Sequence, residues 1–265
     1  MRTGTVAIIV KHYEGNVSEM NPISEVYQCD CLEFLKTCKD GQFELCIWDP
    51  PYGINANRMG MGGTANNRRT ARRMYKEHTE EKKKGRLNSG GGKLKERLIK
   101  QSLFDWDNEI PCQEVFDEVM RVSKNQIIWG GNYFPLPPTR CVICWDKIQP
   151  WENFSQIEMA WTSFDMPAKL FRFDNRSWNK WHPTGKPLEL YAWILRNFAK
   201  EGDKILDPMF GGGTSRIASY LLGFDYWGCE INQTYFRLAE EHFRSECLGE
   251  VRLKGGRIAK QLELF

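Results

Sequence analysis

Several features are scarce or missing from this chain of 265 residues, and each excludes a class of protein. No apolar run approaches the roughly 18 residues that a membrane-spanning helix needs. The apolar patch near the start, Val6 to Val10, is too short for the core of a signal peptide, so we expect a cytoplasmic protein. The nine cysteines are scattered, and the CVIC stretch at 141–144 has no second Cys/His pair at zinc-finger spacing. We therefore expect free thiols and no metal site.

Basic charge is concentrated in one segment. The net charge of the chain is only +3, but residues 57–101 hold fourteen Lys and Arg against four Asp and Glu, which gives this segment +10 and leaves −7 for the rest. The segment is rich in glycine and has few large apolar residues, so it cannot bury enough surface to offset the entropy of ordering it. We expect a mobile insertion in a single domain of residues 1–265, and its charge favours contact with a polyanion over a merely solvated linker.

Outside this insertion, short apolar runs alternate with stretches of helical periodicity. We expect strands at 26–29, 45–48, 126–130, 204–206 and 226–229, a closing pair of strands at 141–145 and 157–164, and helices at 32–39, 114–123, 187–200, 214–222 and 234–245. This order predicts an α/β fold, a mostly parallel Rossmann-like sheet with helices on both faces and an antiparallel strand pair on its C-terminal side. In such sheets ligands bind at the carboxyl ends of the strands.

The stretch CIWDPPYGIN, residues 46–55, places a carboxylate and an aromatic ring at the end of a buried strand. Pro50 and Pro51 cannot continue a β-ladder, because neither has an N–H and both fix φ near about −65°. A strand-terminating turn alone would explain the prolines but not Asp49 or Tyr52. The pattern therefore favours a rigid turn that presents Asp49 and Tyr52 at a site.

The stretch ILDPMFGGGTS, residues 205–215, predicts a strand, a glycine turn and a helix that opens at Thr214. Glycines allow close approach of a ligand to the backbone. The stretch has no Walker lysine, which disfavours a triphosphate. Glu230 ends the next strand, where it could accept hydrogen bonds from ribose hydroxyls, as in adenosine-cofactor sites. These features alone do not separate a nicotinamide dinucleotide from S-adenosylmethionine.

DPPY at 49–52 and DPMFGGGT at 207–214, with HPTGKPLEL at 182–190 between them, resemble the motifs of the amino-methylating DNA methyltransferases. DPPY precedes the glycine loop, which is the order of the β group of that family. VYQCDCLEFL at 26–35 resembles the segment whose acid lies near the cofactor adenine, and IIWGGNYF at 127–134 resembles the lining of the target-base pocket. The resemblance covers about Glu25 to His242 and implies a restriction-modification type of enzyme from a bacterium or a phage. The basic insertion directly after DPPYG departs from the shorter loop of many relatives.

The resemblance, together with the charge of the basic insertion, predicts three groups of site residues. The catalytic group is Asp49, Pro50, Pro51 and Tyr52. The group that would bind S-adenosyl-L-methionine is Asp30, Asp49, His182, Thr184, Lys186, Asp207, Pro208, Phe210, Gly211, Gly213, Thr214, Glu230 and Asn232. The group that would contact double-stranded DNA is Arg68, Arg69, Arg72, Arg73, Lys82, Lys83, Lys84 and Asn132.

The identity of the methylated base is a separate question. Asp at the first position of DPPY favours N6 of adenine, whereas Ser there favours N4 of cytosine, so N4-cytosine is the second choice. A cytosine-C5 mechanism would use Cys112 of the Pro-Cys-Gln stretch, but in that family the glycine loop precedes Pro-Cys, and here it follows. A small-molecule or protein methyltransferase and a non-catalytic DNA-binding module remain less favoured alternatives. The sequence leaves open a homodimer and a cognate restriction endonuclease.

Overall fold

The computed structural model describes residues 21–54, 107, 109–149, 155–178, 185–252 and 258–260. The basic insertion expected at 57–101 lies outside the described residues. The same holds for the expected site residues Arg68, Arg69, Arg72, Arg73, Lys82, Lys83, Lys84, His182 and Thr184. The remaining residues of the expected site are all described.

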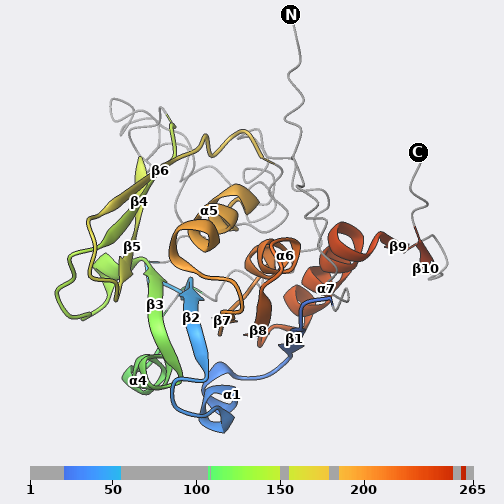
Figure 1. Ribbon diagram of the computed structural model, residues 1–265, viewed down its shortest axis with the longest axis horizontal. Helices are drawn as coiled ribbons and strands as arrows, with labels where there is room; N and C mark the ends of the chain where they lie inside the picture. The colour runs from blue at the N-terminus through green and yellow to red at the C-terminus, as the bar shows by residue number, and fades with distance from the viewer. Residues whose placement is uncertain are drawn as a thin grey trace, which may run out of the picture.

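An eight-stranded mixed sheet forms the centre of the molecule (Figure 1). Its strands are β1 (Ser24–Tyr27), β2 (Phe43–Trp48), β3 (Ser123–Trp129), β4 (Val142–Asp146), β5 (Ile157–Thr162), β6 (Lys169–Arg172), β7 (Lys204–Asp207) and β8 (Asp225–Cys229), in the order β1-β8-β7-β2-β3-β5-β4-β6. The first five in this order are parallel, and β5 runs antiparallel to both β3 and β4. The predicted fold, with its antiparallel closing pair, is confirmed.

Helices lie on both faces of this sheet. They are α1 (Cys31–Thr37), α4 (Gln113–Val122), α5 (Leu188–Phe198), α6 (Thr214–Leu221) and α7 (Gln233–Leu248), with a 3-10 turn η4 (Gly131–Tyr133) and a small hairpin of β9 (Glu250–Arg252) and β10 (Ile258–Lys260). Within the described ranges, no helix has the length and apolar character to cross a membrane.

The alternation of side chains along β2 explains the three-layer arrangement. Leu45 and Ile47 belong to the core cluster formed with α5, α6 and α7, whereas Cys46 and Trp48 belong to the cluster formed with α1 and α4. All four side chains are 1% exposed or less. A strand covered on both faces needs a continuous apolar run, and this is why the LCIW stretch has no polar residue. Figure 1 shows α1 and α4 on the opposite side of the sheet from α5 and α6.

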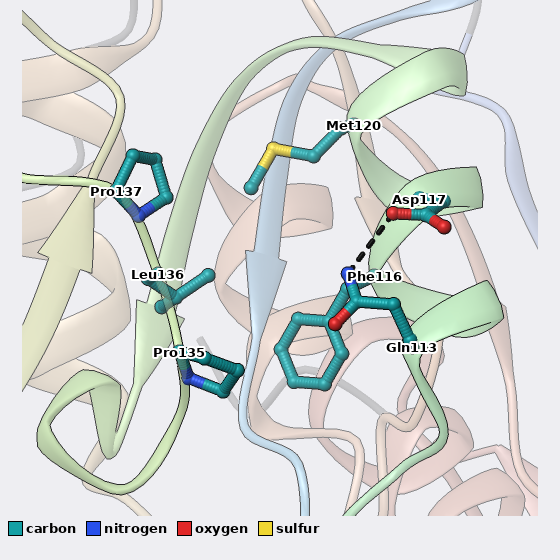
Figure 2. Close-up of a pocket in the computed structure, with 7 residues that line it drawn as sticks. All are labelled: Gln113, Phe116, Asp117, Met120, Pro135, Leu136 and Pro137. Carbon is teal, nitrogen blue, oxygen red and sulfur yellow. Dashed lines mark hydrogen bonds between the residues drawn. The ribbon is translucent and has the colours of Figure 1, made fainter.

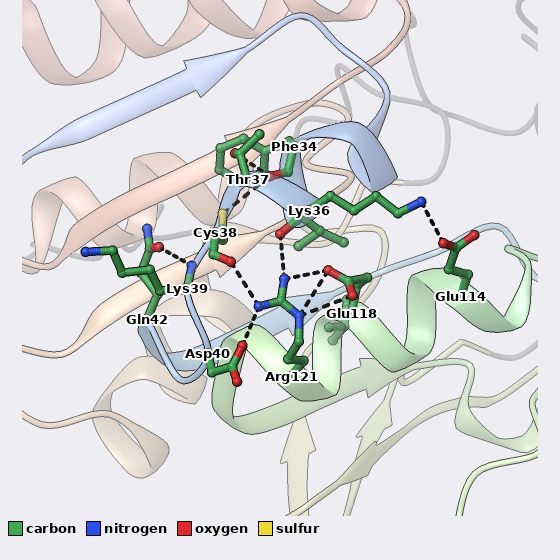
Figure 3. Close-up of polar contacts among 12 residues, drawn as sticks. Phe34, Lys36, Thr37, Cys38, Lys39, Asp40, Gln42, Glu114, Glu118 and Arg121 are labelled. Atoms are coloured by element: carbon green, nitrogen blue, oxygen red, sulfur yellow. Dashed lines mark hydrogen bonds and ion pairs between the residues drawn. The ribbon is translucent and has the colours of Figure 1, made fainter.

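One arginine joins the two helices of the α1/α4 layer. The guanidinium of Arg121, near the end of α4, donates hydrogen bonds to the carbonyl oxygens of Leu35 at 3.0 Å and Cys38 at 2.9 Å (Figure 3). It also pairs with Glu118 and Asp40, each at 2.6 Å. The Leu35 carbonyl also accepts from the Cys38 N–H at 3.0 Å, so Arg121 adds a second donor at the end of α1 and caps it from the neighbouring helix.

One expected boundary was wrong, and one strand was not expected. Strand β1 ends at Tyr27 rather than Cys29, because Asp30 is already the N-cap of α1 and its carboxylate accepts from the N–H of Leu32 at 2.8 Å. Strand β6 was not expected, because its stretch KLFR is short and its register comes only from pairing with β4.

Candidate active site at the carboxyl ends of the strands

The acidic residues expected at the site lie along one edge of the sheet. Asp49 follows β2, Asp207 ends β7 and Glu230 follows β8. Because β8, β7 and β2 are neighbours and parallel, their carboxyl ends meet at the same edge. The sheet order thus joins DPPY to the glycine loop, which lies more than 150 residues away in the sequence.

Both carboxylate oxygens of Asp49 have partners. The Tyr52 hydroxyl donates to Oδ1 at 2.6 Å, and the Lys186 Nζ lies 2.5 Å from Oδ2. The same Nζ is 3.3 Å from the Tyr52 hydroxyl, and the Lys186 side chain is only 3% exposed. Burial disfavours the charged lysine, but the nearby carboxylates outweigh burial and raise the pKa of Lys186. Lys186 was expected at the cofactor, and the structure places its charge against the DPPY carboxylate.

The turn of DPPY is held from a distant part of the chain. Oδ1 of Asp107 accepts hydrogen bonds from the backbone N–H of Tyr52 at 2.7 Å and of Gly53 at 3.0 Å. The Asp107 side chain is 1% exposed, so these are buried, charge-assisted bonds. Sequence reasoning missed this residue, because its only hint is a position shortly after the basic insertion.

The ring of Tyr52 lies in an aromatic and glycine-lined setting. Tyr133 stacks on it, with the centroids 5.2 Å and the planes 15° apart, so a base that stacks on Tyr52 takes the place of the Tyr133 ring; Phe134 approaches edge-on at 6.2 Å. Behind the ring lies Gly130, where an added Cβ would meet Tyr52 ring atoms at 2.3 to 2.8 Å. Burial, followed by the charge of Asp49, raises the pKa of the Tyr52 hydroxyl well above its usual value. Tyr52 is therefore a neutral hydrogen-bond donor with a fixed ring plane.

The glycine loop and Glu230 form the other half of the site. The N–H of Gly211 donates to Glu230 Oε2 at 3.1 Å, and the N–H of Asn232 donates to Oε1 at 2.7 Å. Gly211 and Gly213 have φ of 52° and 74°, which is the left-handed region that favours glycine. Burial raises the pKa of Glu230, although both N–H groups act against it. Each carboxylate oxygen keeps further lone-pair capacity for a ligand hydroxyl.

Asp207 has a different environment from the other acids. It is 1% exposed, it accepts from the Ser215 hydroxyl at 2.6 Å, and it accepts from the Met209 N–H at 3.2 Å. Burial raises the pKa of Asp207 to about 7. Its contacts tie β7 to the start of α6, so it supports the loop from beneath.

The other expected residues surround these groups. Pro50, Pro208, Phe210 and Thr214 are buried, and Pro51 is half-buried. Asp30 is exposed and caps α1, while Asn132 is exposed in η4. Asn232 caps α7 by accepting from the N–H groups of Thr234 and Tyr235.

A cavity of about 220 Å³ lies elsewhere, between α4 and the segment after η4 (Figure 2). Its lining is Gln113, Phe116, Asp117, Met120, Pro135, Leu136 and Pro137. None of these residues belongs to the site expected from the sequence, so the cavity is separate from the Asp49 and Glu230 region.

Comparison with known proteins agrees with the geometry. Residues 64–241 match the model of a DNA methylase family of the N6/N4 type. The chain belongs to this family of amino-methylating DNA methyltransferases. The type II methyltransferase M2.MboI of Moraxella bovis is 23% identical over 265 residues, which cover 89% of this chain and 91% of the relative.

Among solved structures, the PvuII DNA methyltransferase, a cytosine-N4-specific enzyme, is similar with a TM-score of 0.51 and 14% identity. The similarity covers 84% of this chain and 87% of the PvuII enzyme. This similarity shows the fold alone. The M1.HpyAVI complex with S-adenosyl-L-methionine has a TM-score of 0.46 at 17% identity, with coverage of 82% of this chain and 98% of that protein.

The methyl donor of this methylase family is S-adenosyl-L-methionine. The structure fits that group at the glycine loop. Glu230 is a carboxylate 9% exposed beside the loop, and an added Cβ at Gly228 would meet the Asp207 carbonyl and the Phe210 ring, each at 3.0 Å. The loop is therefore packed from below and left-handed at Gly211 and Gly213, as close approach of a ligand requires.

Proposed function

We propose that this DNA methyltransferase transfers a methyl group to the exocyclic N6 of an adenine that has left the duplex. The position of the Asp49 carboxylate supports this proposal. Tyr52 and Lys186 hold it at the carboxyl end of β2, at the same edge of the sheet as the glycine loop. An enzyme that acts on an exocyclic base nitrogen must take the base out of the stack. The fixed ring of Tyr52 provides a surface on which such a base can stack.

The lone pair of an adenine amino group is delocalised into the ring and is a weak nucleophile. Hydrogen bonds from the amino N–H groups to Asp49 and to the Pro50 carbonyl would draw the nitrogen toward a tetrahedral geometry. The two prolines fix that carbonyl, which is pre-organisation of the site. S-adenosyl-L-methionine, when bound, supplies an electrophilic methyl on a sulfonium. With the cofactor held at the loop from Asp207 to Thr214, this methyl would be the group that the amino nitrogen receives. Asp49 would stabilise the positive charge on that nitrogen until its extra proton passes to solvent.

For the cofactor, we assign Glu230 to the ribose hydroxyls and the loop from Asp207 to Thr214 to the remainder of the nucleoside. Lone pairs left on the Glu230 oxygens, beside the N–H bonds from Gly211 and Asn232, support this assignment. Asp30 is assigned to the adenine, and the HPTGKP stretch to the methionine end, with His182 and Thr184 outside the described residues.

DNA is the substrate of the family. We assign backbone contacts to Asn132, which is exposed at the carboxyl end of β3, and to the basic residues of the insertion. Action on DNA also places the enzyme in the bacterial cytoplasm. A homodimer and a cognate restriction endonuclease belong to the same hypothesis, and light scattering of the protein with and without DNA tests the first.

Nucleoside mass spectrometry tests the base. A DNA library is methylated with cofactor that carries a deuterated methyl group, then digested to nucleosides. Labelled N6-methyladenine is the expected product. Labelled N4-methylcytosine would replace the adenine assignment with the second choice, and 5-methylcytosine would overturn the role of Asp49.

A further inference from the structure

Lys186 lies between two carboxylates, and only one of them belongs to DPPY. Its Nζ is 2.5 Å from Asp49 Oδ2 and 3.4 Å from Oε2 of Glu158, a residue of β5. The other oxygen of Glu158 pairs with Lys147, which follows β4. The four charges therefore form a row in the order Asp49, Lys186, Glu158, Lys147.

The contact between Lys186 and Asp49 opposes the chemistry assigned to Asp49. Methyl transfer moves positive charge from the sulfonium to the amino nitrogen, and Asp49 must stabilise that charge as it develops. An ammonium in contact with Asp49 neutralises it and repels the developing charge. In a partly buried site this repulsion is screened weakly. An arrangement in which Lys186 contacts Asp49 is thus a poor one for the reaction.

Glu158 offers Lys186 a second position. It is already within 3.4 Å, and its charge is firmly established, because Lys186 and Lys147 outweigh the effect of burial and lower the pKa of Glu158 to about 2. The ring of Trp129, whose centroid lies 4.9 Å from Nζ, gives the ammonium a further favourable surface. A small rotation of a flexible side chain moves the charge from one carboxylate to the other.

We propose that Glu158 is a positioning residue for methyl transfer, which takes Lys186 away from Asp49 when the amino group of the target base arrives. In this arrangement Asp49 faces the amino group as a free anion. The inference rests on the proposed function, since it needs an amino group at Asp49.

The proposal predicts a specific pH dependence. The groups around the Lys186 ammonium are Asp49 and Tyr52 after β2, Glu158 on β5 with its partner Lys147, and Tyr191 on α5, whose own pKa is raised well above the usual value by burial and then by Asp49. Replacement of Glu158 with glutamine removes one of the two anions that raise the pKa of Lys186. At alkaline pH the lysine of this variant loses its proton earlier and releases Asp49.

The experiment measures single-turnover methyl transfer on DNA with the enzyme saturated in S-adenosyl-L-methionine. Glu158→Gln should slow the step by about 10- to 100-fold, the usual effect of losing a partner behind a functional group, with cofactor affinity within about twofold. Its rate should recover toward wild type at alkaline pH, and this recovery should begin at a lower pH than any change in the wild-type rate. Lys147→Met should react at least as fast as wild type, because Glu158 is then free to attract Lys186. Glu118→Gln, an equivalent change in a salt bridge of α4, is the matched control and should not alter the rate.

Different outcomes separate the possibilities. A wild-type rate in Glu158→Gln overturns the proposal, and so does equal slowing of Glu158→Gln and Lys147→Met without alkaline recovery, which is the result of a merely structural cluster. If Glu158→Gln does not fold by circular dichroism, a slowed Lys147→Met overturns the proposal by itself and an unslowed one supports it. Wild-type enzyme that methylates no DNA would overturn the proposed function first.

Discussion

Gly130 gives the sharpest test of how Tyr52 is positioned. Its φ is 68°, and an added Cβ would meet three atoms of the Tyr52 ring at 2.3, 2.5 and 2.8 Å. Gly130→Ala therefore combines two separate effects. The left-handed backbone costs about 1–2 kcal/mol for a residue with a Cβ, and overpacking against the ring costs about 1–3 kcal/mol more. We expect the free energy of unfolding to fall by about 2–5 kcal/mol in total.

A matched control separates these effects. Gly202 has φ of 83° with no heavy atom within 4 Å of an added Cβ, so Gly202→Ala carries only the backbone strain, about 1–2 kcal/mol. The excess loss in Gly130→Ala reports the contact with Tyr52. In a Tyr52→Ala background this excess should disappear, because the ring is absent. Urea unfolding followed by circular dichroism measures the free energies of unfolding of wild type, the three single variants and the Gly130→Ala/Tyr52→Ala double variant.

Methylation assays on the same proteins complete the test. Displacement of the Tyr52 ring should lower single-turnover methylation in Gly130→Ala by at least about 100-fold, because reacting groups misplaced by about 1 Å lose about that much. Cofactor affinity, which depends on the glycine loop, should not change. Equal destabilisation of the Gly130 and Gly202 variants, together with full activity, would refute the role given to the ring.

Five further variants test other contacts. Asp49→Ala should lower the methylation rate by several orders of magnitude and keep the cofactor affinity within about tenfold of wild type. Cys112→Ser should keep its turnover. An active Asp49→Ala together with an inactive Cys112→Ser would favour C5 chemistry. Glu230→Ala should weaken cofactor binding, measured by calorimetry, by about 1.5–3 kcal/mol, and unchanged affinity would disprove the ribose assignment. Asp207 has its pKa raised by burial to about 7 from 3.8, so its stabilisation is full below pH 3.8 and is lost as pH rises to about 7. Asp207→Asn should remove this pH dependence. In scanning calorimetry without cofactor, the melting temperature of the variant relative to wild type should therefore rise between pH 5 and 8. A difference in melting temperature that stays constant over this range would contradict the prediction. Arg121→Met should lower the free energy of unfolding in urea titrations, because the Leu35 and Cys38 carbonyls lose the guanidinium that joins α1 to α4. The loss should be small, since the side chain is partly exposed, and no change would show that water replaces the guanidinium.

The sequence by itself determined the elements and the chemical groups. The apolar run of β2 predicted a buried strand, and the glycines at 211–213 predicted a turn before a helix; the structure adds that Gly211 and Gly213 are left-handed. These features depend on side-chain periodicity and on backbone sterics, which are local. The order of DPPY and the glycine loop indicated the family, and the chain's place in it is confirmed.

Tertiary structure alone decided which distant groups share a site. Strand order brought Asp49 beside the glycine loop, and packing placed Lys186 and Glu158 next to Asp49. Asp107 binds the backbone of the DPPY turn although it lies 55 residues along the chain from Tyr52, and the missing Cβ of Gly130 leaves space for the Tyr52 ring. These contacts join side chains from different strands, and they form because buried charges and rings need partners. The periodicity of a sequence reflects only local structure, so it cannot predict them.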